Sequence, residues 1–321
     1  MRVGIVGAGV VGGRVAAALV RDDEIERIIV VDRRAGPALA HRFDRVGESN
    51  ALPPDLDVVV IASRWGSQAR LAHEAILGGA DVVAVSDSIE DVGALLDLDA
   101  EARERDRLVV VGAGFCPGLT GVLARHGAAE FDSVDEIHIA TVGTAGPWCA
   151  RQHHRALGDR ALDYRDGGWV PHPGGSGRDL FWFPDPIGGA DCYRAALPDP
   201  MLLVPVFPDI RRVTARMAAT RRDRLTARLP MLRRPHPEGL VGAVRVELRG
   251  WRNGAREVAV FGASAVPGDA AAVVAATIAR RIGTAPTHVG AVPLATVVDP
   301  ADFLGRLAAA GLTTERFVGA A

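Results

Sequence analysis

MRVGIVGAGVVGGRVAAALV, residues 1–20, is the stretch that decides the fold of this chain. Gly7, Gly9 and Gly12 fit the pattern G-x-G-x-x-G, directly after a β-branched run and directly before a helical one. In such a turn the first glycine permits a tight bend, the second lets a pyrophosphate approach, and the third lets helix and strand pack closely. The helix N-terminus then faces the negative charge. The stretch therefore predicts a strand, a phosphate-binding turn and a helix.

An acidic residue stands where the ribose of a dinucleotide is expected. Asp32 lies 20 residues after Gly12, at the end of the second apolar run, where a carboxylate can bond the adenosine ribose hydroxyls. Asp32 disfavours a ribose 2'-phosphate, whereas Arg33 and Arg34 favour one. We expect NAD or NADP, and favour NAD because the carboxylate holds the strand-end position. An ordinary tight turn with a helix-capping aspartate is the alternative.

The N-terminal third alternates short apolar runs with amphipathic stretches. The apolar runs are 3–6, 28–31, 58–61, 82–85 and 108–111, and the helical stretches are 11–20, 37–43, 68–77 and 92–104. Runs that are apolar at consecutive positions are typical of strands buried on both faces of a parallel sheet. Alternation of strand and helix predicts right-handed crossovers. We expect an α/β protein whose N-terminal domain is a doubly wound, Rossmann-type parallel sheet.

The loops after the later strands should converge on the cofactor, because ligands of open α/β sheets bind at the carboxyl ends of the strands. Small residues there leave room for the ribose and nicotinamide, which favours a nicotinamide cofactor over FAD. The predicted cofactor-binding residues are Gly7, Ala8, Gly9, Val10, Val11, Gly12, Asp32, Arg33, Ala62, Ser63 and Ser86.

The pattern changes after residue 118, which predicts a second, α+β domain that supplies the substrate pocket. A helix is expected at 118–129 and a strand at 133–142, followed by a long functional loop at 143–191, rich in Gly, Pro, Trp, His and Arg. Strands 241–251 and 256–265 flank Asn253-Gly254, a strong hairpin signal, and their alternation predicts one solvent-facing side. Helices are expected at 269–282 and 300–310. We predict a dinucleotide-binding domain at 1–125, joined by segment 286–321, and a substrate and dimerisation domain at 126–285.

Composition excludes several classes of protein. The chain has 321 residues, 48% of them hydrophobic, which suffices for roughly two domains. Apolar runs fall short of the roughly 20 residues of a membrane span, and the N-terminus reads as a strand, so we expect a cytoplasmic protein. The 37 basic and 39 acidic residues give a net charge of −2, which argues against nucleic acid or membranes as partners. A homodimer and a small-molecule substrate are the expected partners.

Four residues are candidates for chemistry. Cys116 precedes a helix whose N-terminus favours a thiolate, although simple packing is the commoner role of such a thiol. His153 and His154 lie between arginines and offer proton transfer near neutral pH, but adjacent residues point different ways, so at most one should face the site. Arg178, in a glycine-rich segment, can bind a carboxylate or be a surface charge. We expect no metal, because a third ligand at a recognisable spacing is not found, and we expect the three cysteines to be reduced.

Several motifs together resemble the saccharopine dehydrogenase-like family, which includes saccharopine reductases and carboxynorspermidine dehydrogenases. They are the glycine turn and the segments 114–120 (GFCPGLT), 183–188 (FPDPIG), 292–293 (VP) and 302–304 (DFL). Cys116 stands where members of that family commonly carry aspartate. The resemblance implies hydride transfer at a carbon-nitrogen centre, by imine reduction or amine oxidation, on a small carboxylate-bearing amino acid or keto acid. An alcohol or aldehyde oxidoreductase, or a non-catalytic dinucleotide sensor or accessory protein, is the alternative.

Overall fold

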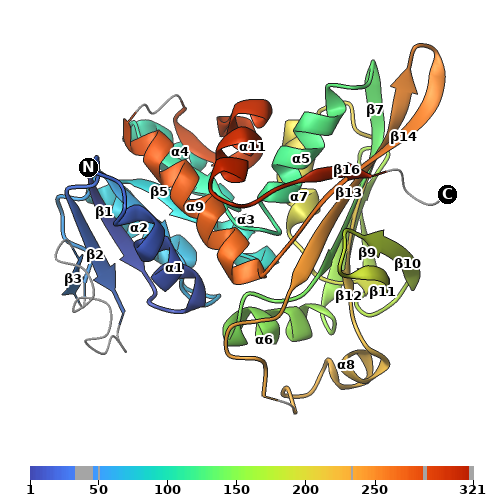
Figure 1. Ribbon diagram of the computed structural model, residues 1–321, viewed down its shortest axis with the longest axis horizontal. Helices are drawn as coiled ribbons and strands as arrows, with labels where there is room; N and C mark the ends of the chain where they lie inside the picture. Colours follow the sequence, from blue (N-terminus) through green and yellow to red (C-terminus); the bar gives the residue numbers. More distant parts are fainter. Residues whose placement is uncertain (33–45, 50, 233, 285–287, 318–321) are drawn as a thin grey trace.

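The computed structural model describes residues 1–32, 46–49, 51–232, 234–284 and 288–317. The described chain forms two β-sheets that lie on opposite sides of a group of helices, as Figure 1 shows. The helix predicted at 37–43 lies outside the described residues. None of the described helices combines the length and the apolar composition that a membrane span requires.

The first sheet is the expected Rossmann-type sheet. Its described strands run in the order β15-β6-β5-β4-β1-β2-β3, and every pairing is parallel. The strands are β1 (Arg2–Val6), β2 (Arg27–Val31), β3 (Val46–Ser49), β4 (Val58–Ile61), β5 (Asp81–Ala84), β6 (Leu108–Val111) and β15 (Gly290–Pro293). The five predicted apolar runs are five of these strands. The sequence analysis missed β3, which is short and contains polar residues, and β15, which comes from the far end of the chain.

Helices cover both faces of the first sheet. Helices α1 (Val10–Leu19) and α9 (Pro267–Thr284) pack together on one face, and α2 (Gln68–Leu77) and α3 (Ile89–Leu96) pack on the other. The single helix predicted at 92–104 is two helices, α3 and α4 (Asp99–Glu104). The sheet is therefore buried on both sides, as the apolar runs predict.

The second sheet is mixed, with one parallel pair, β12 with β7, among antiparallel pairs. Its described strands are β7 (Ser133–Val142), β8 (Arg160–Arg165), β9 (Gly168–Pro173), β10 (Asp179–Phe183), β11 (Gly188–Arg194), β12 (Arg212–Ala218), β13 (Gly242–Arg252), β14 (Ala255–Ala265) and β16 (Glu315–Phe317). The hairpin β13–β14 turns at Asn253 and Gly254, which have φ values of 51° and 76°. The hairpin prediction is confirmed.

Two expectations for this part of the chain are wrong. Segment 143–191 is not a long loop, since it forms α6 (Pro147–Ala156) and most of β8 to β11. Tight glycine turns, such as the one at Gly167, let short strands fold back on one another there. The predicted solvent-facing side of β13 is largely buried, with Arg245 and Glu247 8% and 7% exposed. Arg245 Nη2 donates a hydrogen bond of 2.5 Å to Glu247 Oε2, and this ion pair offsets part of the cost of burying the two charges.

Helices between the sheets join them into one packed unit. Helix α5 (Leu119–Ala128) packs on β13 and β14, while α11 (Pro300–Ala309) packs on α5 and α9. One cluster of buried apolar side chains extends from Val3 in the first sheet through α9 and α5 to Val246 in the second. The remaining described helices are α7 (Asp199–Leu203), α8 (Arg221–Thr226), α10 (Leu294–Val297) and a short 3-10 helix, Val204–Val206. This packing fixes the position of one sheet relative to the other.

Candidate functional site

The glycine turn has the geometry of a phosphate-binding site. Gly7 has φ +102°, and a side chain there would lie 2.7 Å from the carbonyl oxygen of Ala62. A Cβ on Gly12 would collide with the carbonyl oxygen of Gly7, so this glycine lets α1 pack against the turn. Gly9 is exposed and has open space where a side chain would be. Because Gly9 also begins α1 without a side-chain cap, the free N–H groups of the helix face that space.

Asp32 lies at the carboxyl end of β2, beside this turn. Its Oδ2 accepts a hydrogen bond of 2.8 Å from the backbone N–H of Ala8, which fixes the carboxylate at the mouth of the turn. Asp32 and Gly7 line a broad cavity, here called the outer cavity, that extends from the carboxyl ends of β1 and β2 along α2. Arg33, the other residue predicted for the ribose, lies outside the described residues, as does Arg34.

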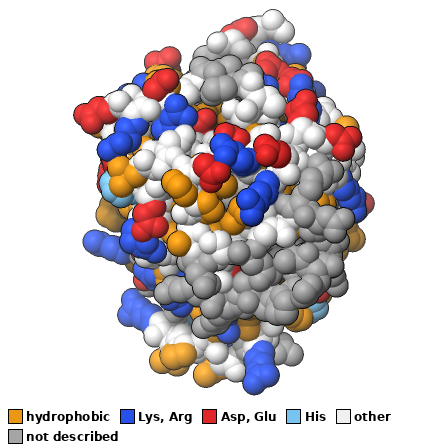
Figure 2. Space-filling model, turned by 90° about the vertical axis from the view of Figure 1, so that its left-hand side faces the viewer, with side chains coloured by type: hydrophobic (Ala, Val, Ile, Leu, Met, Phe, Trp, Pro, Cys, Tyr) orange, Lys and Arg blue, Asp and Glu red, His pale blue; other side chains and the backbone are white. Residues whose placement is uncertain are grey.

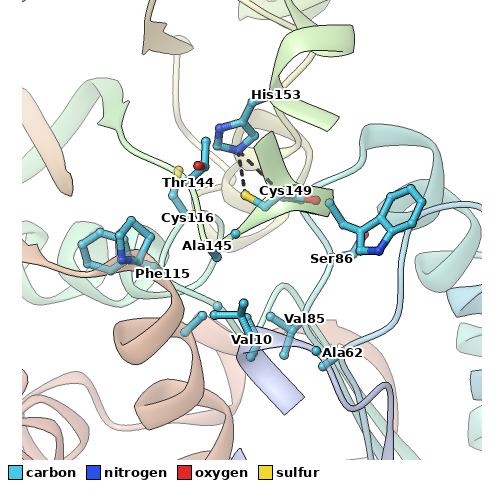
Figure 3. A pocket seen from close by; sticks show the side chains of 18 of the residues that line it. Val10, Ala62, Val85, Ser86, Phe115, Cys116, Thr144, Ala145, Cys149 and His153 are labelled. Carbon is cyan, nitrogen blue, oxygen red and sulfur yellow. Dashed lines mark hydrogen bonds and ion pairs between the residues drawn. The ribbon is translucent and has the colours of Figure 1, made fainter. Parts of the chain in front are cut away.

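A second cavity, here called the inner cavity, continues from the outer one into the space between the two domains. It encloses a volume of about 140 Å³, and part of it is open to solvent. Both cavities are lined by Gly9, Ala62, Ser63, Arg64 and Trp148. Val10, Val11 and Ser86, which were predicted as cofactor residues, line the inner cavity. Figure 3 shows Val10, Ala62 and Val85 at its floor and Cys149 and His153 on the opposite side.

Aromatic residues from both domains meet at the junction of the two cavities. The rings of Trp65 and Trp148 lie edge to face, with centroids 5.6 Å apart. The guanidinium groups of Arg64 and Arg151 lie 5.6 and 4.9 Å from the Trp148 ring. Trp148 is half-exposed on α6, so this contact closes one side of the passage with apolar and cationic surface.

Three side chains with lone pairs converge at the wall of the inner cavity. Cys149 and His153 stand one turn apart on α6, and Asp87 comes from the loop between β5 and α3 of the first domain. His153 Nε2 lies 3.7 Å from Cys149 Sγ and 3.6 Å from Asp87 Oδ2. Burial lowers the pKa of His153, although the charge of Asp87 opposes this, and burial raises the pKa of the Cys149 thiol. At neutral pH the imidazole is therefore neutral, with a lone pair to share, and the thiol is protonated.

A second group of polar side chains lies behind Cys116. Asp199, at the start of α7, is 1% exposed and accepts hydrogen bonds from Thr120 Oγ1 at 2.6 Å and from Cys116 Sγ at 3.4 Å. Burial raises the pKa of Asp199 and also that of Cys116, with the charge of Asp199 as the next cause for the thiol. Cys116 lines the inner cavity and therefore presents a protonated thiol to it.

The structure does not bring the other two candidate residues to this place. His154 Nε2 lies 3.0 and 3.2 Å from the carbonyl oxygens of Thr226 and Leu229, so the ring ties α6 to the segment after α8. Arg178 is largely exposed in the turn before β10 and pairs with Asp191 at 2.9 Å. Neither residue lines the inner or the outer cavity as the described residues form them. Of the two adjacent histidines, one faces the site, as expected for neighbours on a helix.

Sequence reasoning placed the loop 86–88 at the cofactor crevice but assigned no role to Asp87, Cys149 or Asp199. One signal was readable, because Cys149 and His153 are four residues apart and share a face of a helix. Asp87 and Asp199 come from distant parts of the chain, and only the packing of the two domains brings them to the cavity.

The described residues on one face of the first domain carry charges of both signs. On the face shown in Figure 2, acidic and basic side chains of the described residues are interspersed. A mixed surface of this kind does not focus a field of one sign over a large area. The turn and the helix N-terminus supply a local attraction for a phosphate group.

Comparisons with known proteins concern the fold. No family model matches the sequence, and no curated protein matches it. Among solved structures, apo saccharopine dehydrogenase (L-Glu forming) from Saccharomyces cerevisiae aligns with a TM-score of 0.71, over 99% of this chain and 100% of that chain, at 14% identity. DAP dehydrogenase from C. glutamicum, in complex with DAP, aligns with a TM-score of 0.53 over 95% of this chain and 98% of that chain, at 15% identity. An engineered D-amino acid dehydrogenase bound to NADP⁺ gives 0.52, over 93% and 94%, at 15% identity. The chain shares the two-domain fold of these dehydrogenases.

Proposed function

We propose that the protein is an NAD(P)-dependent oxidoreductase that transfers a hydride at a carbon-nitrogen centre of a small, carboxylate-bearing amino acid or keto acid. One observation carries this proposal: the cavity at the glycine turn and Asp32 adjoins, through five shared lining residues, a cavity between the domains that is walled by titratable groups. The shared fold supports it, because the solved structures with that fold are dehydrogenases, two of them named for amino-acid substrates.

The residues present fit a nicotinamide dinucleotide. The open space at Gly9 and the uncapped start of α1 suit a pyrophosphate, and the fixed carboxylate of Asp32 suits the ribose hydroxyls. Val10, Ala62 and Ser86 would border the nicotinamide half in the inner cavity. The bound cofactor would supply or accept the hydride. We infer a preference for NAD, because a 2'-phosphate would meet the negative charge of Asp32.

The substrate half of the inner cavity is proposed to recognise a carboxylate and to hold a proton. Arg64 is the one arginine among the described residues that line this cavity, and a guanidinium binds a carboxylate through two parallel hydrogen bonds. The Cys116 thiol, backed by Asp199, would hold a proton at Sγ beside the reacting atoms. Trp65 and Trp148 would exclude water from the passage above them.

The test combines cofactor binding with a panel of substrates. Purified protein is titrated with NADH and NADPH, and nicotinamide absorbance is then followed with keto acids, each with and without an amine donor. We expect binding of NADH and a turnover that requires both the acid and the amine. Turnover of a keto acid without an amine donor would replace the proposed reaction with carbonyl reduction, and binding without any turnover would leave a dinucleotide sensor.

Arg64→Gln tests the assignment of the carboxylate site. Loss of the guanidinium should raise KM for the substrate about tenfold or more, equivalent to about 1.4 kcal/mol, with cofactor affinity unchanged. Arg178→Gln is the matched control, because Arg178 is exposed and lies away from the cavity. An equal effect of both substitutions would contradict the assignment.

A further inference from the structure

Three side chains with possible metal-ligand atoms lie close together at the wall of the inner cavity. Ligand atoms of Asp87, Cys149 and His153 all lie within 4.8 Å of one another. Two of the residues share one face of α6, and the third reaches them from the other domain. Figure 3 shows the His153 ring and the Cys149 sulfur turned toward each other at the edge of the cavity.

This arrangement does not suit a relay of protons through the histidine. In a Cys–His–Asp relay the thiol and the carboxylate bond opposite nitrogens of the imidazole. Here both Cys149 Sγ and Asp87 Oδ2 lie nearest to the same nitrogen, Nε2. One ring nitrogen carries one proton or one lone pair, so it cannot serve both neighbours in a relay. Convergence of three donor atoms on one space is instead the geometry of a metal site.

The two separations from His153 Nε2 match those of a tetrahedral zinc site. With Zn–S near 2.3 Å, Zn–N near 2.0–2.1 Å and Zn–O near 2.0–2.2 Å, tetrahedral angles place sulfur about 3.6 Å from nitrogen and nitrogen about 3.4 Å from oxygen. The observed distances from His153 Nε2 are 3.7 Å to Cys149 Sγ and 3.6 Å to Asp87 Oδ2. An ion can therefore enter with movements of a few tenths of an ångström.

We propose that Asp87, Cys149 and His153 bind a Zn²⁺ ion at the wall of the inner cavity. A thiolate, a carboxylate and a neutral imidazole balance the two charges of the ion, and this mixture of donors suits zinc better than magnesium or calcium. Helical residues four apart are a common pair of zinc ligands, as in H-E-x-x-H. The sequence spacing alone had led to the opposite expectation, that the chain binds no metal.

Three protein ligands leave one position of the ion open. All three residues line the inner cavity, so the open position faces the space where the substrate is proposed to bind. Zinc sites with three protein ligands and an open position are typically catalytic, because the ion polarises a bound oxygen or nitrogen atom. This role, unlike zinc binding itself, rests on the proposed function.

Cobalt substitution of the full-length protein tests the site. The protein is stripped with a chelator and titrated with Co²⁺ alone, because Co²⁺ bound tetrahedrally by a thiolate absorbs strongly in the near ultraviolet and the visible. We expect one equivalent of Co²⁺, displaced by Zn²⁺. Cys149→Ser should abolish the thiolate band, and His153→Gln and Asp87→Asn should each weaken binding by about 100-fold or more, since even outer-sphere changes cost 10–100-fold.

Matched controls come from the same cavity and the same helix. Cys116→Ser removes a thiol of the inner cavity that lies outside the cluster, and His154→Gln removes the adjacent imidazole; both should keep the cobalt band. Circular dichroism identifies variants that fail to fold. If one of the two control variants does not fold, the other still serves as the comparison. A wild-type protein without a thiolate band, or a band lost in Cys116→Ser and kept in Cys149→Ser, would overturn the proposal.

Titrating NADH into the same stripped samples separates the two proposals. Cofactor binding without a cobalt site would remove the zinc proposal and leave the oxidoreductase. A cobalt site without cofactor binding would remove the oxidoreductase proposal and leave the zinc site.

Discussion

The glycines of the turn at residues 7–12 differ in the atoms that an added methyl group would meet. Substitutions at Gly12 and Gly9 should therefore affect different properties, namely protein stability and cofactor affinity. We predict that Gly12→Ala destabilises the protein by about 1–3 kcal/mol, because the new Cβ would collide with the Gly7 carbonyl and displace α1. Gly9→Ala should leave stability nearly unchanged, since open space surrounds that position, but should weaken NADH binding about tenfold or more. Thermal unfolding and cofactor titration of both variants check the pair. Equal effects on stability would contradict the geometry.

We propose that the charge of Asp32 decides whether the site accepts a ribose with a 2'-phosphate or one without it. Asp32→Asn keeps a side-chain oxygen for the hydrogen bond from Ala8 but removes the negative charge. We predict that the ratio of NADPH to NADH affinity rises about tenfold, because the repulsion of a 2'-phosphate disappears. Titration with each cofactor measures this ratio. An unchanged ratio would show that residues other than Asp32 decide the preference.

At the scale of elements, a buried histidine on β7 makes the stability of the folded protein depend on pH. His138 contacts Thr214 at 2.8 Å and Glu136 at 2.9 Å, and burial lowers its pKa, although Glu136 raises it and Arg249 lowers it. His138 therefore takes up a proton at a higher pH in the unfolded chain than in the folded chain. Stability is therefore lost as the pH falls below about 6.5.

We predict that His138→Gln has a shallower loss of unfolding free energy between about pH 7 and pH 5 than the wild-type protein. Urea unfolding at each pH gives the two curves. The buried carboxyls of Asp81, Asp91 and Asp199 have raised pKa values and act with the opposite sign, but they are common to both proteins. Parallel curves would mean that His138 does not contribute.

The contact of α5 with the hairpin depends on a glycine. A side chain at Gly127 would collide with the ring of Phe261 and lie 2.8 Å from Leu248 Cδ1. We predict that Gly127→Ala costs about 1–3 kcal/mol of stability through overpacking. Gly305→Ala on α11, where the added methyl meets open space, should instead stabilise by up to about 1 kcal/mol through helix propensity. Chemical unfolding of both variants compares them, and the same sign for both would refute the packing argument.

Elements with local signals could be predicted from the sequence. Consecutive β-branched residues identified β1, β2, β4, β5 and β6, and Asn-Gly identified the hairpin, because each pattern lies within a few residues. Strand β15 carries a proline and pairs with β6 across most of the chain, so nothing local marks it. The zinc ligands show the same limit: the Cys149–His153 spacing is local, whereas Asp87 arrives through packing of the domains.

At the scale of the whole molecule, the site lies where the two domains meet, so a ligand there should hold them together. Arg155 of α6 pairs with Glu90 of α3 at 2.6 Å, and Arg14 of α1 pairs with Glu238, which precedes β13, at 3.1 Å. We predict that NADH at about 100 times its Kd adds about 2.7 kcal/mol to the free energy of unfolding. It should also change the fluorescence of Trp65 and Trp148. Differential scanning calorimetry and fluorescence measure the two effects, and a stabilisation without any change in fluorescence would place the ligand away from this junction.

The return of the chain's end to both sheets has a consequence for how the protein is made. β15 completes one edge of the first sheet, and β16 pairs with β14 of the second. While the ribosome is still translating, the outer edge of β6 has no neighbour until residue 293 has emerged. An unpaired strand edge invites pairing with other nascent chains. Speed of synthesis through residues 290–317 would then influence how much native protein a cell recovers.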